Sequence, residues 1–98
     1  MKIEKKQDGG ALVIALEGRL DTTTAPELER ELKDSLGGIT ELTFDMARLD
    51  YISSAGLRVL LLAHKTMKKQ GGMKLINLSE IVREVLDVTG FSDILTVE

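Results

Sequence analysis

The chain is poor in the residues that usually carry covalent, metal or redox chemistry. It has no cysteine and no tryptophan, one histidine, one tyrosine, two phenylalanines and one proline among 98 residues. The lack of cysteine excludes disulfides and thiolate metal sites. Its apolar runs, such as 59–63, are far shorter than the ~20 residues that a membrane helix needs. These absences point away from a disulfide scaffold, a zinc protein and a membrane-spanning protein.

Charge and length restrict the class of protein further. The formal net charge is −3 at pH 7, so the chain lacks the basic surface typical of nucleic-acid-binding proteins. Hydrophobic residues make up 43% and charged residues 30%, which is ordinary for a globular domain. We expect a single domain over residues 1–98. The absence of cysteine fits a reducing compartment, so we expect a cytoplasmic protein. The lysines among residues 1–7 argue against edge-to-edge pairing with another copy, so we also expect a monomer when free.

The first third of the chain predicts a β-hairpin followed by a helix. Residues 1–7 are charged, as is typical of an edge strand. Asp8-Gly9-Gly10 is a strong turn signal. Residues 11–17 are apolar until their end, which predicts a strand buried on both faces. An amphipathic helix follows, because a leucine recurs every four residues, at Leu28, Leu32 and Leu36.

The remainder alternates strands and helices. The expected elements are a strand over 41–46, a loop from Ala47, a helix from Ser53 or Ser54 to Gln70, a strand over 73–78, a helix from Ser79 to Thr89 and a strand over 94–97. The middle helix is too broadly apolar for a surface helix, so it should be the most buried. The order predicts an α/β fold with a mixed sheet of about five strands and about three helices, joined by right-handed crossovers. The pattern leaves open whether the helices cover one face or both.

Ser54 lacks the partner that a catalytic serine requires. A nucleophilic serine needs a base within hydrogen-bond reach. The only histidine, His64, lies ten residues further along the same predicted helix, roughly 15 Å away. No phosphate-binding loop motif is present, and the aspartates at 21, 45 and 50 fall on different elements. We therefore expect no enzyme activity, no cofactor and no metal site, and expect Asp45 to bond loop amides.

The junction at Ser53 and Ser54 has two interpretations. Serine is among the best residues at a helix N-cap, so either serine could simply cap the helix. If Ser53 is the cap, Ser54 lies on the first turn with its hydroxyl outward. A phosphate there would be tolerated, because a helix N-terminus favours anions. A partner facing that surface would then meet a bulky dianion.

Five segments of the chain carry a shared pattern. They are Gly18-Arg19-Leu20-Asp21, the stretch from Phe44 to Leu57, Gly71-Gly72, Ser79 and the stretch from Asp87 to Phe91. Together they resemble the STAS domain family (sulfate transporter and anti-sigma factor antagonist), in its short bacterial anti-sigma-antagonist form. The first segment is similar to the family's G-x-[LI]-D and the second contains its [DS]-S-[AST]-G-[LI] signature, and the resemblance spans nearly the whole chain.

The resemblance implies a partner-switching protein. In such systems the unmodified antagonist binds an anti-sigma factor that is also a serine kinase, and so frees the sigma factor. The resemblance makes Ser54 the phospho-acceptor, reset by a PP2C-type phosphatase. It assigns the partner-facing surface to Asp21, Gly56 and Leu57, beside both serines. Many members have an acid where this chain has Ser53, which is a second candidate acceptor.

Two other functions remain as alternatives. The chain could be a STAS scaffold that is not phosphorylated, in a transporter or another signalling assembly. It could also be a small enzyme or nucleotide-binding protein. The last is disfavoured, because the chain offers no base near Ser54 and no phosphate loop.

Overall fold

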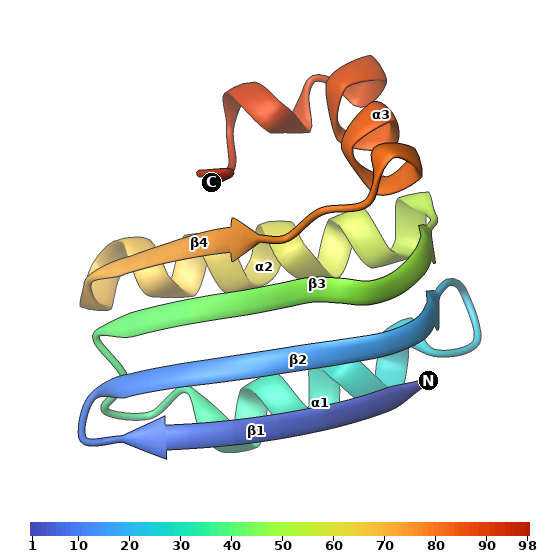
Figure 1. Ribbon diagram of the computed structural model, residues 1–98. Coiled ribbons are helices and arrows are strands. Elements are labelled where there is room, and N and C mark those ends of the chain that lie inside the picture. Colours follow the sequence, from blue (N-terminus) through green and yellow to red (C-terminus); the bar gives the residue numbers. More distant parts are fainter.

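A computed structural model describes residues 1–98 as one α/β layer structure. Its elements are β1 (Lys2–Asp8), β2 (Ala11–Leu20), α1 (Ala25–Ser35), β3 (Glu41–Ile52), α2 (Ser54–Gln70), β4 (Gly72–Ile76), α3 (Glu80–Thr89) and a 3₁₀ turn, η1 (Phe91–Asp93). The sheet has the order β1-β2-β3-β4 (Figure 1). β1 is antiparallel to β2, whereas β2, β3 and β4 run parallel. The predicted mixed sheet and hairpin are therefore confirmed.

Helices α1 and α2 cover one face of the sheet and leave the other open. In Figure 1 both lie behind the strands, whereas α3 lies beyond β4. The covered face carries alternate strand residues that are almost fully buried, among them Leu12, Ile14, Leu42 and Phe44. Helix α2 is the most buried helix, as predicted, although Leu62 remains 44% exposed. None of the helices is both long and apolar enough to cross a membrane.

The prediction that residues 11–17 are buried on both faces was wrong. Burial alternates along β2, and Val13 on the open face is 38% exposed. The sequence is misleading here because the open-face residues of β2 include alanine and valine, which leave the run continuously apolar. Small apolar side chains are common on protein surfaces, so an unbroken apolar run does not require two covered faces.

Strand β3 extends six residues beyond the predicted boundary at Met46, to Ile52. The expected loop from Ala47 is part of this strand. Two register shifts place extra residues in β3: Ala15 and Glu17 of β2 pair with Asp45 and Arg48, and Gly18 and Arg19 pair with Leu49 and Tyr51. Such β-bulges bend a strand and increase its twist. Strand β3 curves accordingly near its end in Figure 1.

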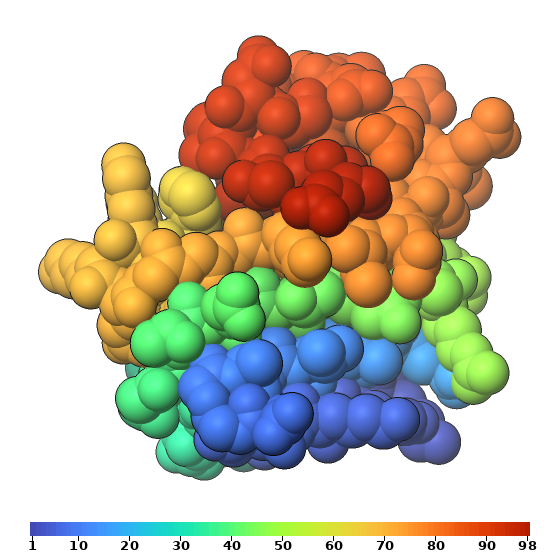
Figure 2. Space-filling model, turned by 60° about the vertical axis from the view of Figure 1, so that its left-hand side comes forward, coloured from blue at the N-terminus to red at the C-terminus, as the bar shows by residue number.

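The chain ends without a fifth strand. The strand expected over 94–97 is reduced to one isolated parallel bridge between Leu75 and Val97, preceded by the 3₁₀ turn. Two backbone hydrogen bonds, Leu75 N–H to Thr96 O and Glu98 N–H to Leu75 O, each 2.9 Å, hold the end of the chain against β4. Figure 2 shows these last residues, in red, lying over the orange strand β4. The sheet therefore has four strands.

Candidate functional site

The start of α2 distinguishes the roles of the two serines. Ser53 is the N-cap, with extended backbone (φ −100°, ψ 176°), and its side chain accepts a hydrogen bond from the Gly56 N–H at 3.5 Å. Ser54 is the first helical residue; its side chain takes no part in the cap, and it is exposed. The cap is therefore made without Ser54, and the Ser54 hydroxyl lies on the molecular surface.

The end of β2 lies beside this helix start. Leu20 and Ile52 are register partners, and the next residue, Ser53, donates its N–H to Leu20 O at 2.9 Å. The Asp21 loop and the Ser53–Ser54 junction therefore meet at the carboxyl ends of two parallel strands, where functional groups gather in such sheets. In Figure 1 both lie at the right-hand end of the sheet.

The Asp21 carboxylate organises the turn between β2 and α1. Its Oδ1 accepts hydrogen bonds from the Thr23 hydroxyl at 2.8 Å and from the Thr23 and Thr24 N–H groups at 3.0 and 3.2 Å. The hydroxyl bond from Thr23 is the largest cause that lowers the pKa of Asp21 below 3.8, assisted by the backbone amides and opposed by desolvation. Asp21 therefore presents a negative charge, held in place by its own turn, near the start of α2.

An arginine–tyrosine pair borders the same region and was not identified from the sequence. The Arg19 guanidinium lies 4.4 Å from the centroid of the Tyr51 ring, and its Nε is 3.8 Å from Asp21 Oδ2. Stacking on an aromatic ring and pairing with a carboxylate are both typical of arginine. The two residues are 32 positions apart, and only the second bulge of β3 makes them register partners.

Gly56 and Leu57 are buried at the base of the site. A Cβ added to Gly56 would lie 2.7 Å from Leu20 Cγ and 2.9 Å from Ile52 Cγ1, so the glycine lets α2 approach both strand ends. Leu57 is 3% exposed. The site thus has an exposed serine, Ser54, and a half-buried carboxylate, Asp21, above a buried pair that holds the start of α2 in place.

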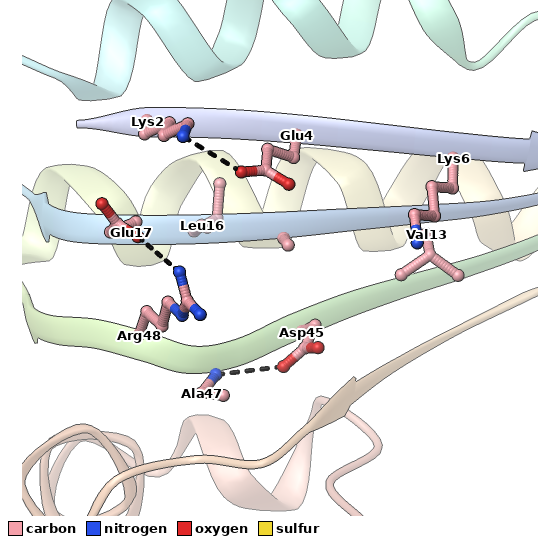
Figure 3. Close-up of a pocket in the computed structure, with 10 residues that line it drawn as sticks. Lys2, Glu4, Lys6, Val13, Leu16, Glu17, Asp45, Ala47 and Arg48 are labelled. Carbon is pink, nitrogen blue, oxygen red and sulfur yellow. Dashed lines mark hydrogen bonds and ion pairs between the residues drawn. The ribbon is translucent and has the colours of Figure 1, made fainter.

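The open face of the sheet contains a shallow, charged pocket (Figure 3). Arg48 pairs with Glu17 at 3.1 Å, and Lys2 pairs with Glu4 at 3.3 Å. Asp45 accepts hydrogen bonds from the Ala47 N–H at 3.1 Å and from Asn77 Nδ2 at 3.2 Å. We expected Asp45 to bond loop amides, but the Ala47 N–H belongs to strand β3 and only the Asn77 side chain lies outside the strands. Asp45 itself lies at the first bulge of β3.

The groups considered for catalysis are dispersed. His64 is half-buried in α2, ten residues beyond Ser54 on the same helix. No group of three or more histidine, aspartate or glutamate side chains is arranged to hold a metal ion. The site near Ser54 is a surface with an exposed hydroxyl beside a carboxylate that its own turn holds in place.

Three proteins illustrate the similarity of this chain to bacterial regulators. BtrV of Bordetella bronchiseptica, provisionally named an anti-sigma factor antagonist, is 40% identical over 99 residues, covering 99% of this chain and 85% of that protein. The anti-sigma-B factor antagonist of Bacillus subtilis is 32% identical over 98 residues, covering 99% and 90%. The anti-sigma-B factor antagonist of Listeria monocytogenes is 30% identical over 97 residues, covering 96% and 84%.

Solved structures show the same fold. An anti-sigma factor antagonist from Mycobacterium paratuberculosis superposes with a TM-score of 0.89 at 21% identity, covering 98% of this chain and 83% of that one. The antagonist SpoIIAA in its unphosphorylated form gives a TM-score of 0.86 at 20% identity, covering 99% and 88%. SpoIIAA from Bacillus in its phosphorylated form gives 0.76 at 20% identity, covering 99% and 91%.

The model of the STAS domain matches residues 2–98, nearly the full chain. This match agrees with the relatives above, with the four-stranded mixed sheet and with the serine at the start of α2. The chain therefore belongs to the STAS domain family.

Proposed function

We propose that this chain is an anti-sigma factor antagonist, a binding protein and not an enzyme, and that phosphorylation of Ser54 switches it off. In its unphosphorylated form it binds an anti-sigma factor and so releases the sigma factor. Three relatives that are 30% or more identical to this chain bear the name of antagonist. The observation that carries the switch is the exposed Ser54 at the first position of α2, with the cap supplied by Ser53.

The geometry at Ser54 suits a reversible phosphate. A phosphoserine adds about −1.5 to −2 charge at pH 7. The first turn of a helix has free N–H groups and the positive end of the helix dipole, which both favour an anion. Because Ser54 makes no cap, its modification leaves intact the hydrogen bond that the Gly56 N–H donates to the Ser53 hydroxyl oxygen. The phosphate changes the binding surface and leaves the fold in place.

The neighbouring residues have distinct roles in this proposal. Asp21 and the two serines form the surface that meets the anti-sigma factor. Gly56 and Leu57 act from beneath, because both are buried: they fix the helix start on which Ser54 is displayed. Ser53 is the weaker acceptor candidate, since its hydroxyl oxygen is engaged in the cap and its residue is half-buried.

The partners follow from the same proposal. The anti-sigma factor is itself the serine kinase that modifies Ser54, and a PP2C-type phosphatase removes the phosphate. All three proteins meet in the cytoplasm, and the free antagonist is a monomer. The chain binds neither nucleic acid nor a membrane, in keeping with its net charge of −3.

A kinase assay tests the switch. The wild-type chain, Ser54→Ala and Ser53→Ala are each incubated with the kinase encoded beside the gene and with ATP, and their intact masses are measured. We expect one phosphate on the wild-type chain and on Ser53→Ala, and none on Ser54→Ala. Unchanged mass in all three proteins would refute the proposal and favour a scaffold that is not phosphorylated. Loss of the phosphate only in Ser53→Ala would reassign the acceptor.

A further inference from the structure

Arg58 lies one helical turn beyond Ser54 on α2. Residues four positions apart on a helix are surface neighbours, with Cβ atoms about 5–6 Å apart. Arg58 is exposed, like Ser54. It takes part in none of the six ion pairs of the structure. Its guanidinium is therefore free to meet a charge that appears at position 54.

The charge around the start of α2 is unbalanced. The first turn of this helix contains no acidic residue, in contrast to α1 with Glu27 and α3 with Glu80. A negative group in the first turn of a helix is favourable, so α2 lacks a stabilising feature that the other two helices have. A phosphate on Ser54 would supply that charge, and it would do so directly beside Arg58.

The other nearby arginine is already engaged. Arg19 stacks on Tyr51 and pairs with Asp21, so its guanidinium has two partners before any modification. Moving it to a phosphate would break both contacts. Arg58 has no such contact to lose, and its planar guanidinium matches the oxygens of a phosphate.

We infer that Arg58 is the counter-charge for phosphorylated Ser54: its guanidinium donates to the phosphate oxygens across one turn of α2 and holds the dianion against the helix. This inference rests on the proposed phosphorylation of Ser54. Arg58 acts as a positioning residue, which fixes where the phosphate points and therefore which surface a bound kinase or phosphatase meets. The paired phosphate also loses protons at lower pH than an isolated phosphoserine.

The test places phosphoserine at position 54 during protein synthesis, so that it needs no kinase. The second pKa of the phosphate is then measured by ³¹P NMR titration in the wild-type chain, Arg58→Gln, Arg58→Lys and Lys69→Gln. We expect this pKa to rise by about 0.2–0.4 unit in Arg58→Gln, the effect of losing one exposed i,i+4 ion pair. Arg58→Lys, which keeps the charge, should restore most of the difference.

Lys69→Gln is the matched control. It removes one exposed positive charge from the same helix, 15 residues from Ser54 and thus about 22 Å along the axis, where salt screens the interaction. We expect no change in the phosphate pKa. An unchanged pKa in Arg58→Gln, or an equal rise in Lys69→Gln, would overturn the inference. A wild-type chain that no kinase modifies would refute the proposed function and leave this titration valid.

Discussion

Asp21 shows how a single half-buried side chain can be kept charged by the turn in which it lies. Four hydrogen bonds from Thr23 and Thr24 are all donated to the same carboxylate oxygen, and all favour the ionised form. Arg19 approaches the other oxygen at 3.8 Å. The charge and orientation of Asp21 are thus set by its own turn before any partner arrives.

We predict that Thr23→Val raises the pKa of Asp21. The substitution keeps the β-branched shape and removes the hydroxyl donor that lowers the pKa most. A carboxyl whose pKa is lowered by folding stabilises the fold above its unfolded pKa, and this contribution is lost as pH falls through the folded pKa. The variant should therefore lose less stability than the wild type between about pH 5 and pH 2.

The measurement combines carboxyl titration by NMR with urea unfolding at several pH values. Thr22→Val is the control, because Thr22 is the neighbouring threonine and donates none of the hydrogen bonds that hold Asp21. Equal titration of Asp21 in both variants would show that the hydroxyl bond does not control its ionisation.

At the scale of the element, the position of α2 depends on how closely its first turn approaches the ends of two strands. Gly56 is the third residue of the helix and packs against Leu20 and Ile52, which end β2 and β3. The same two strands are joined to the helix start by the backbone bond from Ser53 to Leu20. The display of Ser54 is consequently linked to the packing of both strand ends.

We predict that Gly56→Ala destabilises the fold by about 1–2 kcal/mol, measured as the free energy of unfolding in urea. Overpacking a core by one methyl costs roughly 1–3 kcal/mol, and part of this is offset by the higher helix propensity of alanine. Gly37→Ala is the control, since no atom lies within 4 Å of a Cβ at that position. Equal effects in the two variants would mean that the close approach is not what requires glycine.

The elements differ in how well the sequence predicts them. The helices were predicted closely, because caps and glycines mark their ends: Ser79 caps α3, and Gly90 ends it in the left-handed conformation at φ 80°. The second half of β3 was missed because Met46, Leu49 and Ile52 are buried at every third position. Two bulges produce this spacing, and a period of three matches neither a strand nor a helix.

The site could be predicted only in outline. The choice of Ser53 as the cap was one of two alternatives, and the helix geometry decided it. The burial of Gly56 and the stacking of Arg19 on Tyr51 depend on contacts between distant parts of the chain. Such contacts follow from strand register, which local sequence patterns do not specify when bulges intervene.

At the scale of the whole molecule, one layer of helices covers one face of the sheet and the other face stays open. The buried core has 23 residues, and they come from the β-strands, from α1 and α2 and from the region around α3. Ser54 lies at one end of the helix layer, outside the core. A charge added there should change what the surface binds and leave the packing between the layers unchanged.

We predict that Ser54→Asp weakens binding to the anti-sigma factor without altering the fold. The far-UV circular dichroism and the melting temperature should match those of the wild type, and small-angle scattering should give the same overall size, consistent with the Cα radius of gyration of 12.1 Å. Ser54→Ala should match the wild type in all three measurements and still bind. Unfolding or expansion of Ser54→Asp alone would show that position 54 is structural.

The two bulges of β3 impose a rule on how the length of this chain can vary. Between Asp45 and Ile52 the strand contains two residues more than the paired segment of β2 from Ala15 to Leu20. Each extra residue turns the following side chains to the opposite face of the sheet. The second extra residue therefore returns them to the face on which they lay before the first. Deleting one residue here would turn Ile52 toward solvent and misplace the helix start, whereas deleting both would preserve the alternation. Insertions and deletions in this segment are therefore expected in pairs.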